Sequence, residues 1–175
     1  ASAAKGQAGT WLLDPRNITI KSGGAAGTEG EPNFTAVSDN AVVTTESIQN
    51  ALNGGTSVSV STGSNGLQEG NITIADNIEK TAGGDATLAL SAANIRLGSD
   101  SSIMTNGGNI DLYGGTTGKE TGYAGSVNAA IAGVELQGGV VLDTRIDGGL
   151  TGGGYISVRG SNSGNNIGDQ SVGYY

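Results

Sequence analysis

The stretch from Gly70 to Leu97, GNITIADNIEKTAGGDATLALSAANIRL, contains three copies of one short pattern. Each copy alternates a polar or small residue with an aliphatic one over four positions: residues 71–74, 87–90 and 94–97. This alternation is typical of a strand that buries one face. Gly83 and Gly84 separate the first copy from the second, and glycine pairs favour turns. The stretch therefore predicts short strands joined by glycine-rich turns.

Five further units of the same kind recur along the chain, at residues 17–20, 57–60, 109–112, 134–136 and 155–158. Their spacing is on the order of 20 residues, which is typical of repeat proteins. Strands this short are marginal alone, but stacked coils bury a continuous core. The pattern predicts a parallel β-helix (β-solenoid) of roughly seven to nine coils. An antiparallel sandwich is the alternative, with Asn65-Gly66 and Asn106-Gly107 as hairpin turns.

The segment from Thr45 to Gly54 departs from the strand pattern and predicts one short helix. Its apolar residues fall on one helical face: Ile48, Ala51 and Leu52. Thr44 or Thr45 suits the N-cap, and Gly54 stands where a glycine commonly ends a helix. We expect this helix to lie on the flank of the strand core.

The composition excludes several classes of function. The 175 residues include 33 Gly but neither Cys nor His, and the formal net charge is −8. A chain without Cys and His has no disulfide, no thiolate metal site and no Ser-His-Asp triad. An acidic chain without a Lys/Arg cluster repels nucleic-acid phosphates, and no apolar run approaches the ~18 residues of a transmembrane helix. We expect no nucleic-acid partner and no membrane insertion, with any targeting sequence outside the given chain.

Three stretches resemble one family of proteins: GTWLLDPRNITI (residues 9–20), SIQNALNGGTSVSVSTG (47–63) and the stretch from Gly70 to Leu97. They are similar to the repeat region of filamentous-haemagglutinin-like bacterial adhesins, large exoproteins exported by two-partner secretion. The likeness is densest over residues 9–97 and thins after Gly115. It implies a right-handed β-helix on the bacterial cell surface. This chain is much shorter than such exoproteins, and their secretion-recognition domain is not evident in it.

These observations together predict an all-β fold, a right-handed parallel β-helix (β-solenoid) with one short helix on its flank, over residues 1–175 as a single domain. The predicted function is that of a non-catalytic, secreted bacterial surface protein, a stalk or fibre element in attachment or cell-cell contact. Its expected partners are further copies of itself, cell-surface glycans or surface proteins. The alternative is a carbohydrate-binding or polysaccharide-cleaving β-helix module.

Self-association through the ends of the coils is one form of this hypothesis. Terminal coils carry unpaired backbone N–H and C=O groups, which are a template for another chain. Trp11, Tyr174 and Tyr175 lie near the two ends of the sequence, and we expect them to help bury such a contact. Frayed termini with exposed rings are the alternative interpretation.

An enzyme would need carboxylates suited to acid/base catalysis. Side chains alternate between the two faces of a strand, which places Asp143, Arg145 and Asp147 on one outer face. Asp111 and Arg96 take outward positions on nearby coils. Because a guanidinium between two carboxylates holds both ionised, it opposes the raised pKa that a general acid requires. The row therefore indicates ion pairs rather than a catalytic site, and we predict no enzymatic activity.

The remaining candidate sites lie on the outer face. Asn17, Asn33 and Asn71 each begin an Asn-x-Thr sequon, and they are candidates for glycosylation. The rings of Tyr113, Tyr123 and Tyr155, together with Arg145, suit carbohydrate binding or lateral packing. Several aspartates could supply oxygen ligands for calcium, but they form no recognised calcium motif: Asp76, Asp85, Asp100, Asp111 and Asp147. Calcium is therefore unassigned, and no other cofactor is expected. The Thr/Ser run over residues 56–62 does not recur on other units, which excludes an ice-binding array.

Overall fold

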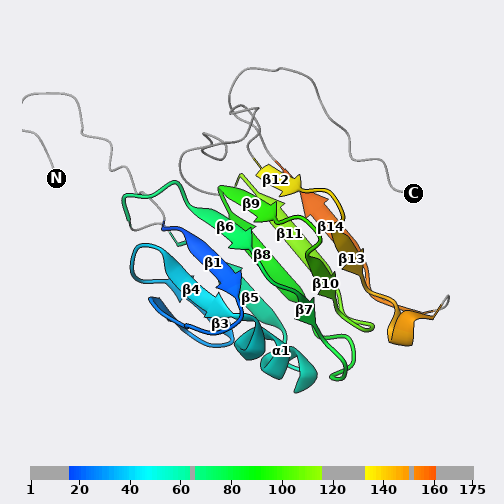
Figure 1. Ribbon diagram of the computed structural model, residues 1–175. Helices are drawn as coiled ribbons and strands as arrows, with labels where there is room; N and C mark the ends of the chain where they lie inside the picture. Colours follow the sequence, from blue (N-terminus) through cyan, green and yellow to red (C-terminus); the bar gives the residue numbers. More distant parts are fainter. Residues whose placement is uncertain (1–15, 64–65, 116–132, 150–151, 161–175) are drawn as a thin grey trace, which may run out of the picture.

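The computed structural model describes residues 16–63, 66–115, 133–149 and 152–160 (Figure 1). These residues form fourteen strands, one α-helix and one 3-10 helix. The elements in chain order are β1 (Ile18–Lys21), β2 (Thr28–Glu29), β3 (Asn33–Ala36), β4 (Ala41–Thr44), α1 (Thr45–Asn53), β5 (Val58–Ser61), β6 (Asn71–Ile74), β7 (Ile78–Glu79), β8 (Leu88–Ala92), β9 (Asn94–Leu97), β10 (Ser102–Met104), β11 (Ile110–Gly114), β12 (Gly133–Leu136), β13 (Val141–Asp143), η1 (Ile146–Gly148) and β14 (Ile156–Arg159).

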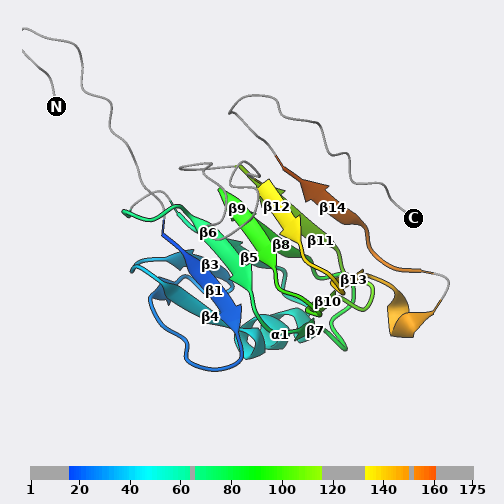
Figure 2. The ribbon, with the colours of Figure 1, turned by 45° about the horizontal axis from the view of Figure 1, so that its top comes forward.

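The strands belong to three separate sheets. A five-stranded sheet has the order β12-β9-β6-β1-β4, a six-stranded sheet has the order β14-β11-β8-β5-β3-β2, and a three-stranded sheet has the order β13-β10-β7. Neighbouring strands run parallel, except that β2 runs antiparallel to β3. In the six-stranded and three-stranded sheets the strands follow one another in sequence order, whereas in the five-stranded sheet β1 and β4 exchange places at one end. One end of the molecule therefore holds the early strands and the other end the last strands (Figures 1 and 2).

The eight short units predicted from alternation are confirmed as strands. They correspond to β1, β5, β6, β8, β9, β11, β12 and β14, each within a residue or two of the predicted bounds. The predicted helix is confirmed as α1, where the Thr44 hydroxyl accepts from the Ser47 N–H at 3.2 Å and Ile48 and Leu52 are fully buried. Gly54 follows the last helical residue with a φ of −75°, and the left-handed conformation that ends the helix falls on Gly55, with a φ of 79°.

The predicted fold class, an all-β right-handed parallel β-helix, is wrong. It required all neighbouring strands to run in one direction, whereas β2 opposes β3 and Ala26 forms an antiparallel bridge with Val42. The chain turns back there because Gly27 has a φ of +65° and passes so close to Ser38 that a Cβ would lie 1.9 Å from its hydroxyl oxygen. Three separate sheets, one of them mixed, and a helix within the unit define an α/β-type sheet fold.

The core consists of aliphatic side chains from the inward positions of the strands. Ile18, Ile72 and Ile95 pair across β1, β6 and β9, and none is more than 1% exposed. The next inward positions repeat the arrangement with Ile20, Ile74 and Leu97. Burial of each such side chain contributes roughly 1.5–3 kcal/mol. Parallel register places aliphatic side chains of neighbouring strands directly against one another. A narrow core is therefore well packed without many aromatic rings.

A ladder of asparagines joins the beginnings of four strands in the five-stranded sheet. Asn17 Oδ1 accepts from the Asn71 N–H at 2.8 Å, and Asn94 Nδ2 donates to Asn71 Oδ1 at 2.7 Å. Asn94 Oδ1 in turn accepts from the Gly133 N–H at 3.2 Å. Asn94 is 1% exposed, so these bonds satisfy polar groups that water does not reach.

Among the residues that the structure describes, no helix is long and apolar enough to cross a membrane.

Candidate functional site

The outer face of the six-stranded sheet carries small side chains next to large ones. Parallel register places Ser59, Ala89, Asp111 and Ser157 in one row across β5, β8, β11 and β14. The next outward row consists of Ser61, Ser91, Tyr113 and Arg159. The surface is therefore low over β5 and β8, and it rises at β11 and β14.

This difference in height creates an open groove of about 320 Å³. Ala89 and Ser91 lie on its low side, while Tyr113, Tyr155 and Arg159 stand on its high side. The two rings are 47% and 55% exposed, so they are available to a ligand rather than part of the core. The volume is at the lower end of the range for small-molecule sites and suits a short part of a longer ligand.

Asp111 and Arg159 give the groove its polarity. The Tyr155 hydroxyl donates a hydrogen bond to Asp111 Oδ2 at 2.9 Å. This bond and the negative charge of Asp111 raise the pKa of Tyr155, while the positive charge of Arg159 acts in the opposite direction. At neutral pH Tyr155 is therefore a hydroxyl group held in a fixed direction, beside a carboxylate that accepts hydrogen bonds and a guanidinium that donates them.

The structure brings two of the predicted binding residues together and leaves the third apart. Tyr113 and Tyr155 line the same groove. Arg145 follows β13 of the three-stranded sheet, where its Nε donates to both carboxylate oxygens of Asp143, at 2.9 and 3.0 Å. It therefore belongs to an ion pair and not to the groove.

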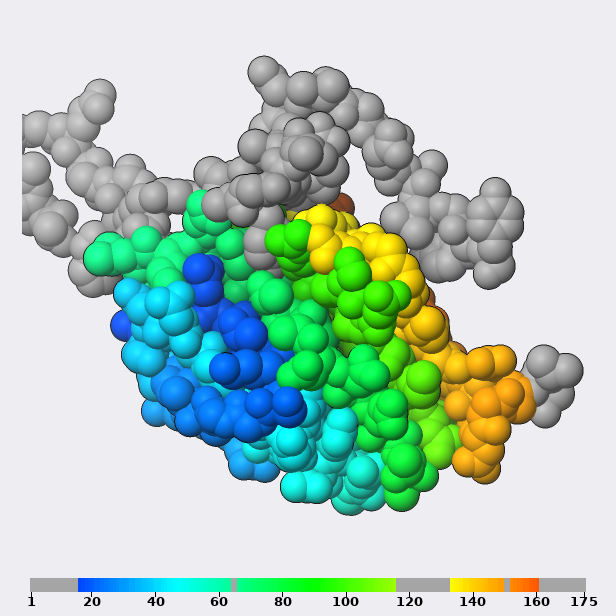
Figure 3. All heavy atoms as spheres, viewed as in Figure 1, coloured from blue at the N-terminus to red at the C-terminus, as the bar shows by residue number. Residues whose placement is uncertain are grey.

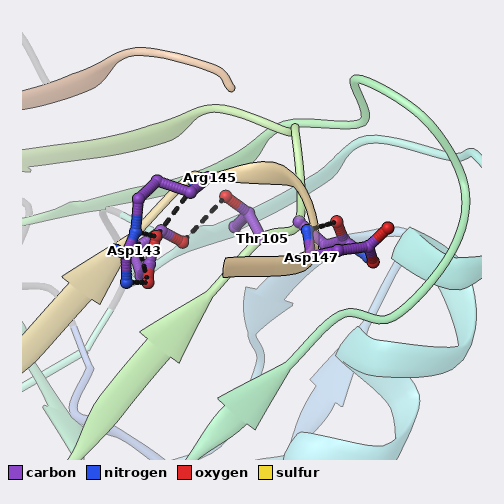
Figure 4. Close-up of polar contacts among 5 residues, drawn as sticks. Thr105, Asp143, Arg145 and Asp147 are labelled. Atoms are coloured by element: carbon purple, nitrogen blue, oxygen red, sulfur yellow. Dashed lines mark hydrogen bonds and ion pairs between the residues drawn. The ribbon is translucent and has the colours of Figure 1, made fainter. Parts of the chain in front are cut away.

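The predicted row of Asp143, Arg145 and Asp147 is not formed (Figure 4). Strand β13 ends at Asp143, and Asp147 lies in a 3-10 turn with a φ of 48°, where its N–H donates to Asn106 Oδ1 at 2.9 Å. The hydrogen bonds from Arg145 lower the pKa of Asp143 despite some burial. A carboxyl group that is held ionised is a poor general acid.

The three sequon asparagines differ in accessibility. Asn33 is exposed, and its Oδ1 accepts from the Ser59 hydroxyl at 2.9 Å. Asn71 is only 7% exposed, and Asn17 is half-buried, since both belong to the asparagine ladder. Asn33 is therefore the sequon that a glycosylating enzyme reaches most easily in the folded chain.

Some predicted sites are not placed by the structure. Trp11, Tyr123, Tyr174 and Tyr175 lie outside the described residues. Over the described residues, no three acidic side chains gather into a group that could hold a metal ion. Calcium thus remains unassigned.

Two features of the groove were missed in the sequence analysis. Arg159 lies one position beyond the predicted strand of residues 155–158, and the low side depends on Ala89 and Ser91, which attract no notice alone. Aligning the units at residues 87–90, 109–112 and 155–158 would have placed Ser91, Tyr113 and Arg159 in one row.

Comparison with known proteins adds no relative to this description. No family model, curated protein or solved structure matches the chain. The fold and site therefore define the class by themselves: an α/β-type protein of three separate sheets with an open, tyrosine-lined groove on one sheet face.

Proposed function

We propose that this chain is a non-catalytic, secreted bacterial surface protein that acts in attachment, and that the groove over β8, β11 and β14 binds carbohydrate. One observation carries the proposal: two exposed tyrosine rings stand beside a carboxylate and a guanidinium on an otherwise flat sheet face. The acidic composition and the resemblance of residues 9–97 to bacterial adhesins support the extracellular setting.

The chemistry of the groove matches that of a sugar. The C–H faces of a pyranose stack on the faces of Tyr113 and Tyr155, since both are amphipathic surfaces with polar edges. Asp111 accepts bonds from sugar hydroxyls, and Arg159 donates to ring and hydroxyl oxygens. The low floor at Ala89 and Ser91 leaves room for a chain of sugars to lie along the sheet.

The lowered pKa of Asp143 opposes hydrolysis at the candidate pair that the sequence offered, which lies outside the groove. Glycoside hydrolysis needs a carboxylic acid that keeps its proton near neutral pH. The best candidate pair from the sequence is instead an ion pair, with Arg145 bound to Asp143. The predicted acid/base pair is thus unsuited to hydrolysis, and we propose attachment as the role of the groove.

Binding to an array of immobilised oligosaccharides tests this function. The Tyr113→Ala and Tyr155→Ala variants should each bind about tenfold more weakly than the native chain, because loss of a stacked ring costs about 1.4 kcal/mol. Tyr113→Phe is the matched control, since it keeps the ring and should stay within a few-fold of native binding. The proposal fails if the native chain binds no oligosaccharide, or if Tyr113→Ala binds as the native chain does.

A further inference from the structure

At the end of the molecule that holds the first strands, the edges of two sheets are covered. Ala26 covers the outer edge of β4, with its N–H donating to Val42 O at 3.1 Å and its carbonyl accepting from the Val42 N–H at 2.7 Å. Strand β2 covers the outer edge of β3 in the six-stranded sheet. An edge whose backbone groups are paired offers no template to another chain.

Helix α1 covers the first edge of the third sheet. Gln49 Oε1 accepts from the Glu79 N–H of β7 at 3.0 Å. Asn53 Oδ1 accepts from the N–H groups of Thr81 and Ala82, at 2.7 and 3.0 Å. At this end, which we call the blocked end, the edges of β4, β3 and β7 are therefore each covered, and β2, the outermost strand of the six-stranded sheet, has only two residues and offers a very short edge.

The opposite end is open over the part of the chain that the structure describes. Strands β12, β13 and β14 are the outermost strands of their sheets, with no described strand beyond them. Ile156 and Val158 of β14 are only partly buried, although the residues they pair with in β11 are fully buried. Leu136 and Val141, 40% and 45% exposed, belong to the same end, whose yellow and orange atoms are seen in Figure 3.

The backbone of β14 has a defined pairing pattern. The Ile110 N–H donates to Tyr155 O at 3.0 Å, and Ile110 pairs with Ile156. Alternate residues of a parallel strand bond to the same neighbour, so Tyr155, Ser157 and Arg159 direct their backbone groups toward β11. The N–H and C=O groups of Ile156 and Val158 are therefore directed toward the open edge.

We propose that two copies of this chain pair through β14, with the strands antiparallel about a two-fold axis at Ser157. This register places Ile156 of each copy opposite Val158 of the other, where their edge-facing N–H and C=O groups form four hydrogen bonds. Both side chains lie on the inner face, as directly opposite residues must. The pairing requires no bound carbohydrate.

The outer face of this pairing is also self-complementary. Tyr155 of one copy lies opposite Arg159 of the other, so a cation–π contact forms twice. Arg159 approaches the Asp111 carboxylate that holds the Tyr155 hydroxyl. The exposed Leu136 and Val141 side chains of the two end faces come together as the edges join. Because the other end of each copy is blocked, the assembly closes at two chains and does not grow into a fibre.

Sedimentation equilibrium of the full chain, in the absence of carbohydrate, tests the proposal. The chain has a mass of 17.2 kDa, and we expect twice this mass at high concentration. Val158→Pro removes the N–H that faces the open edge but no bond to β11, so the monomer keeps its fold while the dimer loses two of its four hydrogen bonds. The dissociation constant should rise at least tenfold, with a native circular dichroism spectrum.

Arg159→Glu is the second variant, and Lys21→Glu is its matched control. Both change the net charge by the same amount, but Arg159 lies at the open end and Lys21 at the blocked end. We expect Arg159→Glu to weaken the dimer at least tenfold and Lys21→Glu to leave it unchanged. A native chain that stays monomeric, a Val158→Pro variant that dimerises like the native chain, or assemblies longer than two would each overturn the proposal.

Discussion

At the scale of single residues, Lys80 is the most unusual group of the core. It is 2% exposed, and its ammonium group donates to three backbone carbonyls, including those of Thr105 at 2.8 Å and Asn106 at 3.0 Å. Burial lowers the pKa of Lys80, and the charge of Asp85 partly opposes this shift. The Lys80 side chain thus links the segment after β7 to the turn after β10 by hydrogen bonds, at the point where both strands have ended.

Replacement of Lys80 by Met should lower the free energy of unfolding by about 1–3 kcal/mol, because the carbonyls lose their donor and stay buried. Urea denaturation followed by circular dichroism measures this change. Lys21→Met, at a more exposed lysine, should change the free energy of unfolding by no more than about 0.5 kcal/mol. Equal effects of the two substitutions would show that the carbonyl contacts contribute nothing.

The hydrogen bond between Tyr155 and Asp111 should make the stability of the fold depend on pH in the alkaline range. The folded chain holds the phenol proton more tightly than the unfolded chain, since the pKa of Tyr155 is raised. Its contribution to stability is therefore present below the pKa of an unfolded tyrosine and is lost as the pH rises through the raised pKa. Asp111→Asn removes the negative charge and should lower the pKa of Tyr155.

Titration of ¹³C-labelled tyrosine by NMR measures this pKa. Asp76→Asn serves as the control, because the Asp76 carboxylate bonds to Ser22 and not to a tyrosine. An unchanged Tyr155 pKa in Asp111→Asn would contradict the geometry of the groove.

At the scale of elements, the asparagine ladder sets the starting points of four strands. Asn94→Ala leaves Asn71 Oδ1 and the Gly133 N–H without their partner, and both lie at buried positions. We expect a loss of about 1–3 kcal/mol in the free energy of unfolding. Asn33→Ala is the matched control, because Asn33 is an exposed asparagine at the start of a strand outside the ladder. Its loss in the free energy of unfolding should be much smaller. Comparable losses at Asn94 and Asn33 would mean that the hydrogen bonds of the ladder contribute nothing to the free energy of unfolding.

Eight strands could be predicted from the sequence because alternation is a local property. Strands β7 and β10, with two and three residues, are too short to show a period. The fold class could not be predicted, since it depends on the return of the chain past Gly27 and on the pairing of β2, which local pattern does not encode. Tyr113 could be selected as an exposed ring, but its neighbour Arg159 follows from register between strands far apart in sequence.

At the scale of the whole molecule, the two ends differ and the groove lies near the open one. Tyr155 and Arg159 belong to β14, the last strand of its sheet, so the same strand supplies a wall of the groove and the free edge. Pairing of two copies through β14 would bring two grooves side by side on one continuous sheet. A polymeric carbohydrate could then contact both, which strengthens attachment through effective concentration.

The proposed function depends on carbohydrate binding over Tyr113 and Tyr155. The most direct measurement is NMR of the chain labelled with ¹³C at its tyrosine rings, titrated with an oligosaccharide that the array identifies and with one that it rejects. We expect the ring signals of Tyr113 and Tyr155 to shift in proportion to binding of the first sugar and not to move with the second. Binding of the first sugar with both ring signals unmoved would contradict the proposed function.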